Sequence, residues 1–185
     1  MIEPEEVSLD LAVRDEAALL SNLLELYSHD LSDTFGLELG LDGRFGYQNL
    51  PLYWSEPERR FPFLIRCGIR VIGFAFATRG LPASIDLKAF DVAEFFVLRK
   101  YRRGGVGRRA AFLLWNRFAS GWTVRVSEAN AAGYRFWARI ISEFSNGAFT
   151  EATHPGTPHM WRVFSFESRN RESSRRELSG VAESH

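Results

Sequence analysis

Residues 94–111 read Glu-Phe-Phe-Val-Leu-Arg-Lys-Tyr-Arg-Arg-Gly-Gly-Val-Gly-Arg-Arg-Ala-Ala, and this segment says more than any other about the 185-residue chain. Its first residues belong to a β-forming run at 90–98, whose continuous apolar second half is typical of a central strand. A basic turn with three glycines follows. Helix formers then extend over 108–118, until Gly121 ends the run. The sequence therefore predicts a buried strand, a glycine-rich turn and a helix.

The glycine-rich turn has the composition of a phosphate-binding site. A helix N-terminus offers unpaired backbone N–H groups, and glycines let a diphosphate approach them because no Cβ atom stands in the way. Charge-assisted hydrogen bonds to phosphate contribute about 1.5–3 kcal/mol each. The alternative is a tight strand-to-helix turn with solvated arginines. Six basic residues within eleven positions favour the phosphate site: Arg99, Lys100, Arg102, Arg103, Arg108 and Arg109.

One ligand with phosphate groups that the glycine-rich turn suggests is a dinucleotide. Gly105-Val-Gly107-Arg-Arg-Ala110, with a strand at 122–127 and then Glu128, resembles the fingerprint of dinucleotide-binding Rossmann folds. In that fold the first glycine directly follows the strand, whereas here residues 99–103 intervene. The apolar runs upstream also predict an antiparallel hairpin and not a β-α-β unit. The Rossmann-type interpretation is therefore the weaker alternative.

A second resemblance covers more of the chain. Arg102-x-x-Gly105-x-Gly107, between a strand and a helix, resembles motif A of the GNAT acetyltransferases. The segment SEANAAGYRFW (residues 127–137) is similar to a later strand-to-helix segment of that family. Together these motifs place the likeness in residues 94–137, about a quarter of the chain.

The resemblance implies an α/β domain of the α+β type. Its mixed, mostly antiparallel sheet of about seven strands would splay open between the strand at 90–98 and the strand at 122–127, with about four helices around it. Acetyl-CoA would bind in that opening. The other elements that the sequence predicts follow the family's order: strands at 7–13, 61–66, 69–78, 144–150 and 159–166, helices from Arg14 and at 130–141, and an irregular aromatic segment at 30–54.

The same resemblance assigns the residues around acetyl-CoA. A strand that leaves its neighbour frees backbone N–H groups, and such a group can stabilise the oxyanion that forms when an amine attacks a thioester. Backbone groups of Val97, Leu98 and Arg99 would contact the pantetheine and the acetyl carbonyl. Asn130 would face the cofactor from the other side. The pyrophosphate would lie on Arg102, Arg103, Gly104, Gly105, Val106, Gly107 and Arg108.

The catalytic candidates are Glu94, Tyr134 and Trp137. A carboxylate among phenylalanines should have a raised pKa, which makes Glu94 the candidate base; the alternative is a structural ion pair with an arginine. Trp137 stands where many family members have a tyrosine as acid, and an indole N–H donates a hydrogen bond but no proton. Tyr134, one turn earlier, is either a substitute acid or a packing aromatic. This departure keeps open a GNAT-fold module that binds acyl-CoA without turnover.

The acceptor, a primary amine of a small molecule or a peptide, should bind over the first helix and the irregular segment. Aromatic and acidic side chains there are suited to a cationic or aromatic amine. Packing in the core explains most of them equally well. They are Tyr27, Asp30, Tyr47, Tyr53 and Trp54.

Composition restricts the remaining functions. With 23 Lys and Arg residues against 23 Asp and Glu residues, the net charge is zero, which argues against nucleic acid or anionic membrane as a partner. The single cysteine, Cys67, excludes an intrachain disulfide and favours a reducing compartment. His29, His154 and His159 lack metal-ligand spacing, so no metal is expected.

The chain ends suggest a cytoplasmic protein without a leader. The N-terminus is acidic where a signal peptide is basic, and no apolar run reaches the roughly 18 residues of a membrane span. Residues 1–167 form the predicted domain, and a homodimer is compatible with the sequence. Residues 168–185 are rich in Ser, Arg and Glu and cannot offset their ordering entropy, so we expect a disordered tail.

Overall fold

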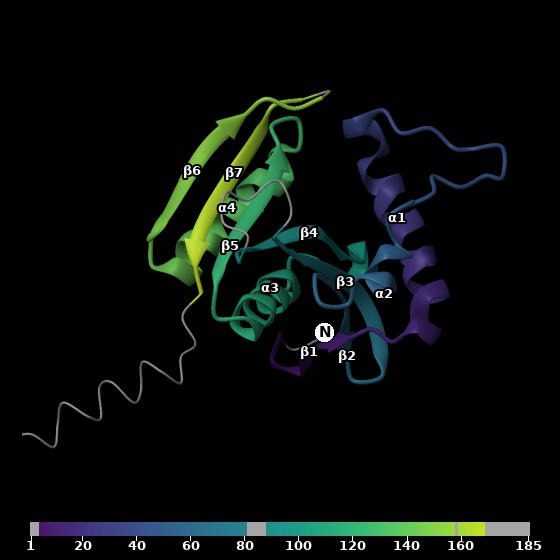
Figure 1. Cartoon of the computed structure of the whole chain (residues 1–185), viewed down its shortest axis with the longest axis horizontal. Coiled ribbons are helices and arrows are strands. Elements are labelled where there is room, and N and C mark those ends of the chain that lie inside the picture. The colour runs from purple at the N-terminus through teal and green to yellow at the C-terminus, as the bar shows by residue number, and fades with distance from the viewer. Residues whose placement is uncertain (1–3, 81–87, 158, 169–185) are drawn as a thin grey trace, which may run out of the picture.

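The computed structural model describes residues 4–80, 88–157 and 159–168 (Figure 1). Seven strands form one sheet in the order β1-β2-β3-β4-β5-β7-β6. The strands are β1 (Val7–Leu11), β2 (Arg60–Cys67), β3 (Arg70–Arg79), β4 (Phe90–Val97), β5 (Gly121–Ser127), β6 (Phe149–His154) and β7 (Trp161–Glu167). The helices are α1 (Ala17–Phe35), α2 (Leu52–Ser55), α3 (Val106–Arg117) and α4 (Ala131–Ser145). None of these described helices is long and apolar enough to cross a lipid bilayer.

The sheet opens between β4 and β5, as the family resemblance implied. These two strands run parallel and pair over only three residues, from Phe90 opposite Trp122 to Val92 opposite Val124. Beyond this point β4 pairs only with β3, and β5 continues along β7. Figure 1 shows the two halves diverging, with β1–β4 and α1 on one side and β5–β7 on the other.

A β-bulge lies in β4 where the strands separate. Glu94 is opposite Phe76, but Val92 is opposite Ala77, so Ala93 is an extra residue with no partner of its own on β3. A bulge of this kind bends a strand and re-aims the side chains that follow it. Strict alternation from Val92 would put Glu94 on the same face as Val92, whereas the bulge turns it to the opposite face.

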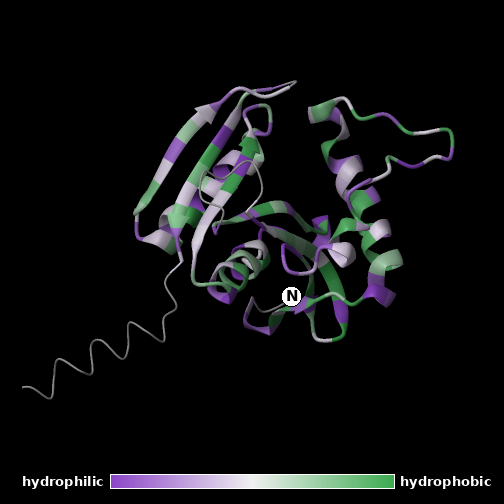
Figure 2. Ribbon diagram, in the orientation of Figure 1, coloured by the Kyte–Doolittle hydropathy of each residue, from purple (hydrophilic) through white to green (hydrophobic). Residues whose placement is uncertain are grey.

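The sheet separates two hydrophobic cores. On one face α3 and α4 cover an aromatic core that includes Phe95, which follows the bulge. On the other face Leu20 and Leu24 of α1 pack against Phe74 of β3 and Phe96 of β4. Figure 2 shows the hydrophobic residues concentrated along the central strands. Glu94 therefore faces the core under α1.

Two predicted boundaries differ from the structure. The helix predicted from Arg14 begins as a 3₁₀ turn at Arg14–Glu16 and continues as α1 to Phe35, where Gly36 ends it with a φ of 61°, so the irregular segment starts later than predicted. The strand predicted at 144–150 is wrong in its first half, because α4 continues to Ser145 and Asn146 ends it in the left-handed conformation. Residues 81–87 and residues 169–185 of the tail predicted at 168–185 lie outside the described residues, whereas Ser168 is described and buried.

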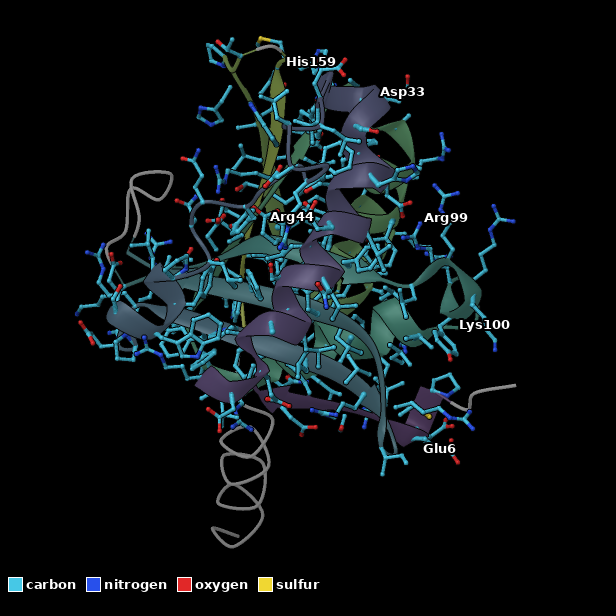
Figure 3. The ribbon with its side chains drawn as sticks, turned by 90° about the vertical axis from the view of Figure 1, so that its right-hand side faces the viewer. Glu6, Asp33, Arg44, Arg99, Lys100 and His159 are labelled. Carbon is cyan, nitrogen blue, oxygen red and sulfur yellow. The ribbon has the colours of Figure 1, made fainter. Side chains whose placement is uncertain are left out.

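The two halves also meet at the end of α1. The Nε2 atom of His159 donates a 2.9 Å hydrogen bond to the carbonyl of Thr34, and the ring of Phe35 stacks on Trp161 with 6.0 Å between centroids. Figures 1 and 3 show the end of α1 beside the β6–β7 turn. The sheet is thus open between β4 and β5, but the contacts of α1 with His159 and Trp161 connect the two halves beyond that opening.

Candidate functional site

A carboxylate with two phenol donors lies at the opening of the sheet. The hydroxyl of Tyr27, on α1, donates a 2.6 Å hydrogen bond to Oε2 of Glu94, and Tyr47 donates a 3.1 Å hydrogen bond to Oε1. Tyr27 also packs edge-on against Phe74 and Phe96. Two residues far from Glu94 in the sequence, Tyr27 and Tyr47, therefore hold its side chain.

The surroundings of Glu94 alter its protonation. Burial raises its pKa above the ordinary value, while the hydrogen bonds from Tyr27 and Tyr47 and the charge of Arg125 act against that rise without cancelling it. Burial and the nearby carboxylate raise the pKa of both tyrosines, so they remain donors. The direction for Glu94 is the one that the sequence predicted. The site therefore offers a carboxylate with a raised pKa that is held in one orientation, which suits a proton acceptor.

An ion pair that the sequence analysis did not predict joins β4 to β5 where the two strands are paired. Arg125 of β5 reaches Asp91 of β4 with both sides of its guanidinium group, at 3.2 Å from Nε to Oδ1 and 2.7 Å from Nη2 to Oδ2. Asp91 is 4% exposed, so the pair offsets the penalty of a buried charge. The only signals were an acid and a base inside two apolar strands, the runs at 90–97 and 121–127.

The backbone of the glycine turn is suited to an anion. Arg103 and Gly105 both have positive φ angles, 67° and 82°, on either side of Gly104. Alternation of this kind turns successive N–H groups toward one side. Gly105 precedes α3, whose first hydrogen bond runs from Arg109 N–H to Gly105 C=O, so the N–H groups before Arg109 have no helical partner. A Cβ atom at Gly104 would meet no protein atom within 4 Å.

Two of the glycines are also required by the protein itself. A Cβ atom at Gly105 would lie 3.2 Å from Pro4, and one at Gly107 would lie 3.2 Å from the ring of Phe136. The sequence argument assigned both to room for a diphosphate alone. The structure adds that Gly107 allows α3 to approach α4 closely.

Several side chains that were predicted to contact ligands form ion pairs within the protein. Arg102 donates to the carbonyl of Val97 at 2.6 Å and pairs with Asp30 of α1, which also pairs with Arg99 at 2.7 Å. Burial acts to raise the pKa of Asp30, but both arginines hold it below the ordinary value. Arg108 pairs with Glu143 of α4. Asp30 therefore faces two arginines, and the side chains of Arg102 and Arg108 are each paired with a carboxylate of the protein.

The backbone assignments also change. Leu98 donates its N–H to the carbonyl of Ile72, and its own carbonyl accepts a hydrogen bond from the N–H of Tyr101, so its N–H is used within the protein. Because successive residues of a strand turn their N–H groups to opposite edges, the N–H of Val97 faces the opening. Figure 3 shows Arg99 and Lys100 projecting outward from the turn after β4.

The start of α4 is organised by its own cap. Asn130 accepts a 2.9 Å hydrogen bond from the N–H of Gly133, and a Cβ atom at Gly133 would lie 2.6 Å from Asn130 Nδ2. Asn130 was predicted to face the cofactor. The structure gives Asn130 the role of helix cap, which fixes the small residue three positions later.

Tyr134 and Trp137 do not meet Glu94. Trp137 is 8% exposed and packs on Phe95, on the face of β4 opposite to Glu94. The hydroxyl of Tyr134 donates to Glu151 of β6 at 3.3 Å. The structure therefore brings neither Tyr134, the candidate acid, nor Trp137 to the candidate base.

Two of the predicted acceptor residues are core residues. Tyr53 is 2% exposed, with its ring 4.3 Å from that of Phe76, and Trp54 packs against the same core. The hydroxyl of Tyr53 and the indole nitrogen of Trp54 are buried without a hydrogen-bond partner. Of the five residues predicted for the acceptor, Tyr27 and Tyr47 are the two that reach Glu94. Within the described ranges, no three His, Cys, Asp or Glu side chains gather in a way that could hold a metal ion.

No protein-family model and no curated protein sequence matches the chain. Several solved structures match the chain in fold. An aminoglycoside acetyltransferase with coenzyme A has 16% identity and a TM-score of 0.66, covering 91% of this chain and 99% of its own. An acetyltransferase from Thermus thermophilus has 16% identity and a TM-score of 0.65, covering 87% and 96%. Spermidine N-acetyltransferase from Vibrio cholerae, with CoA and spermine, has 10% identity and a TM-score of 0.62, covering 89% and 96%. The chain has the fold of the GNAT acetyltransferases, the family that its glycine-rich motif resembles.

Proposed function

We propose that the chain is an acyltransferase that moves the acetyl group of acetyl-CoA to a primary amine of a small molecule or a peptide. One observation carries the proposal: a carboxylate with a raised pKa and two phenol donors lies where β4 leaves β5. The structures that share this fold include acetyltransferases with bound CoA together with kanamycin or spermine. Their acceptors differ widely, so the fold alone does not select one.

The donor site fits the turn before α3. Acetyl-CoA would supply a thioester, an acyl group already activated for attack. The N–H groups of Gly104, Gly105 and Val106 would bind its pyrophosphate at a helix N-terminus, because the positive φ angles turn this backbone toward an anion. The space beside Gly104 is open, which is what such a ligand requires. The N–H of Val97, at the open edge of β4, is our candidate for the developing oxyanion.

Glu94 would remove a proton from the acceptor. A primary amine is protonated at neutral pH and cannot attack until it loses that proton. The carboxylate of Glu94 has an elevated pKa and is fixed in orientation by Tyr27 and Tyr47, which are the properties of a general base. The leaving thiolate is a weak base, since an ordinary thiol has a pKa of about 8.5, so water can protonate it. A dedicated acid at Tyr134 or Trp137 is therefore not required.

A second candidate is a module that binds acyl-CoA without turnover. It is favoured by Trp137, an indole where the family resemblance leads one to expect a phenol, and by its location in the core away from Glu94. The two candidates share the donor site and differ only in whether a thiol is released.

The experiment combines binding with turnover. Calorimetry with acetyl-CoA tests the donor site, and free thiol is then followed with polyamines, aminoglycosides, amino acids and peptides. Thiol release with one acceptor class, abolished in Glu94→Gln, supports the transferase. Binding without release for every class would favour the module. Failure to bind acetyl-CoA would contradict both.

A further inference from the structure

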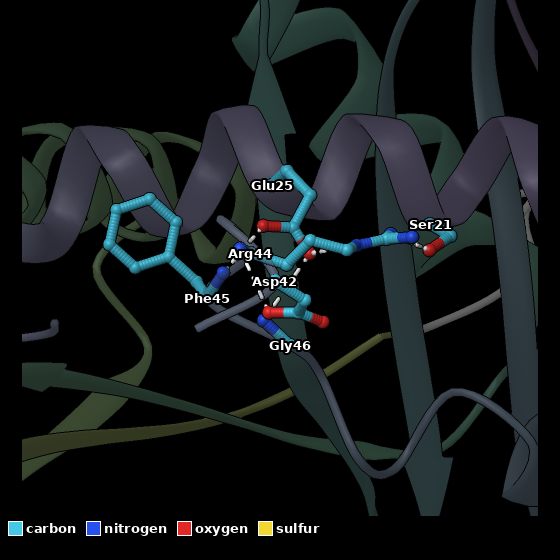
Figure 4. Close-up of polar contacts among 6 residues, drawn as sticks. All are labelled: Ser21, Glu25, Asp42, Arg44, Phe45 and Gly46. Carbon is cyan, nitrogen blue, oxygen red and sulfur yellow. Dashed lines mark hydrogen bonds and ion pairs between the residues drawn. The ribbon is translucent and has the colours of Figure 1, made fainter. Parts of the chain in front are cut away.

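The segment that carries Tyr47 is tied to α1 by one acidic residue. Residues 36–51 connect α1 to α2, and Figure 4 shows how this connection is held. Glu25 of α1 accepts hydrogen bonds from the N–H of Phe45 at 2.7 Å and of Gly46 at 3.3 Å, and it pairs with Arg44 at 3.2 Å. Three consecutive residues of the connection, each through an N–H group, therefore bind a single carboxylate.

The segment has further contacts, both within itself and to the domain, where the ring of Phe45 lies 6.4 Å from that of His29 of α1. Gly40 and Arg44 are joined by a 2.8 Å backbone hydrogen bond, which makes the tip of the connection a compact turn. Arg44 also donates to Ser21, one helical turn before Glu25, at 2.6 Å. Residues 36–44 are exposed, so burial contributes little to holding them. Glu25 is thus the main polar link between the connection and the helix below it.

The backbone that Glu25 binds ends at Gly46, one residue before Tyr47 of the candidate site. Gly46 has a φ of 70°, in the left-handed region, and the next residue is Tyr47, whose hydroxyl reaches Glu94. The ring of Tyr47 packs edge-on to Phe76 at 6.3 Å. The backbone of Tyr47 therefore directly follows two residues whose N–H groups Glu25 binds.

We propose that Glu25 is a positioning residue of the site, which holds Tyr47 on Glu94 by fixing the backbone of Phe45 and Gly46. Its effect on turnover rests on the proposed function, but its effect on Glu94 does not. Burial acts to raise the pKa of Glu25, yet the hydrogen bonds from Phe45, Gly46 and Arg44 hold it below the ordinary value. The anchor is therefore charged and in place throughout the neutral pH range.

The consequence for Glu94 has a definite sign. The groups that face it are Tyr27 of α1, Tyr47 of the connection, Tyr53 of α2, Asp91 of β4 and Arg125 of β5. Tyr47 donates to the ionised form, so its hydrogen bond lowers the pKa of Glu94 against the effect of burial. Release of Tyr47 from Glu94 therefore raises that pKa further.

The test is a double-mutant cycle read by carbon NMR titration of the Glu94 carboxyl group, without acyl-CoA or acceptor. Glu25→Ala should raise the pKa of Glu94 in the same direction as Tyr47→Phe does. In the Tyr47→Phe background, Glu25→Ala should add nothing, because the contact through which it acts is already gone. Alanine is a good helix former, so α1 should persist. Ser21→Ala, which removes only the outer contact of Arg44, is the matched control and should leave the titration unchanged.

A turnover measurement adds a second readout. Glu25→Ala should shift the ascending limb of the kcat/KM profile to higher pH and lower kcat/KM at pH 7 by roughly 10-fold, less than loss of the base itself. Glu25→Gln, which keeps one oxygen acceptor, should fall between Glu25→Ala and the wild type. An unchanged Glu94 titration in folded Glu25→Ala would overturn the proposal, and so would a shift that adds fully to that of Tyr47→Phe. Absence of turnover in the wild type would count against the proposed function and leave the titration result standing.

Discussion

The hydroxyl of Tyr27 lies 2.6 Å from the carboxylate of Glu94, although 67 positions separate them in the chain. This contact joins α1 to the open part of β4 and fixes the carboxylate in one orientation. The bulge at Ala93 makes the contact geometrically available, because it turns Glu94 toward α1. Orientation by a phenol and a pKa raised by burial together give Glu94 the properties of a base.

The donor site is best tested at Gly104. Gly104→Val places its side chain where the protein has open space, so stability should change by about 0.5 kcal/mol or less. If a pyrophosphate occupies that space, the dissociation constant for acetyl-CoA should rise roughly 10-fold or more, the loss of about one charge-assisted hydrogen bond. Calorimetry and thermal unfolding of the same sample separate the two effects.

Gly105→Ala serves as the contrasting variant. Its φ of 82° and the approach of Pro4 mean that a side chain there strains the fold whatever the ligand does. It should lose about 1–2 kcal/mol of unfolding free energy. Unchanged acetyl-CoA affinity in a folded Gly104→Val protein would remove this turn from the donor site.

The ion pairs of Asp30 should contribute to stability and not to acceptor binding. Asp30→Asn removes the partner of Arg99 and Arg102 and should lower the unfolding free energy by about 1 kcal/mol at pH 7, a modest value because Arg99 is largely exposed. Asp33→Asn, on an exposed part of the same helix, is the matched control. Urea unfolding measures the difference.

The pH dependence of this difference has a predicted sign. The pKa of Asp30 is lowered on folding, so its contribution is present above the ordinary aspartate pKa of about 3.9 and is lost as the pH falls through the folded value. The gap between Asp30→Asn and the wild type should therefore close in acid. A gap that persists when Asp30 is protonated would show that the charge is not its cause.

Local patterns made the architecture predictable. The glycine-rich turn at 102–107 lies between an apolar strand and a run of helix formers, and each of these features depends only on neighbours in the sequence. The hairpin of β2 and β3 and the order of elements follow from similar local signals. The opening between β4 and β5 came from the family resemblance and is confirmed by their three-residue pairing.

The contacts of individual side chains were not predictable in this way. An inserted residue such as Ala93 leaves no mark in composition, yet it decides which face Glu94 occupies. The arginines near the glycine turn resembled phosphate ligands, but Arg102 is bound to Asp30, which lies far away in the sequence. Partners of this kind depend on tertiary packing, which a periodicity argument does not contain.

The end of the domain gives a further prediction. Ser168 is buried; its hydroxyl donates to the carbonyl of Trp115, and its N–H donates to Ser120. Ser168→Ala should therefore lower the unfolding free energy by about 1 kcal/mol. Truncation after Arg169 should leave the melting temperature unchanged, because the removed sequence has almost no apolar residues to bury. A large fall in the truncated protein would show that the tail packs on the domain or on a second copy.

The role of Glu94 also has a consequence for stability. Its pKa is raised on folding, so its contribution is fully present below the ordinary glutamate pKa and is lost as the pH rises through the folded value. Glutamine does not ionise, so the Glu94→Gln variant does not lose stability in this way as the pH rises. The stability of the variant relative to the wild type should therefore improve from acid to neutral pH. Thermal unfolding across that range measures the trend. If the side chain were instead a stabilising ion-pair partner, the variant would become relatively less stable as the pH rises.

The most direct test is the pH profile of kcat/KM for Glu94→Gln beside Glu151→Gln, in which the control also replaces a carboxylate that a tyrosine contacts. With an acceptor whose own ionisation is known, Glu94→Gln should lose roughly 10²-fold or more in turnover and lack the ascending limb that reports the carboxylate. Glu151→Gln should keep the wild-type profile, and acetyl-CoA affinity should be the same in both variants. A folded Glu94→Gln enzyme with undiminished turnover across pH 6 to 9 would contradict the assignment of Glu94 as the base.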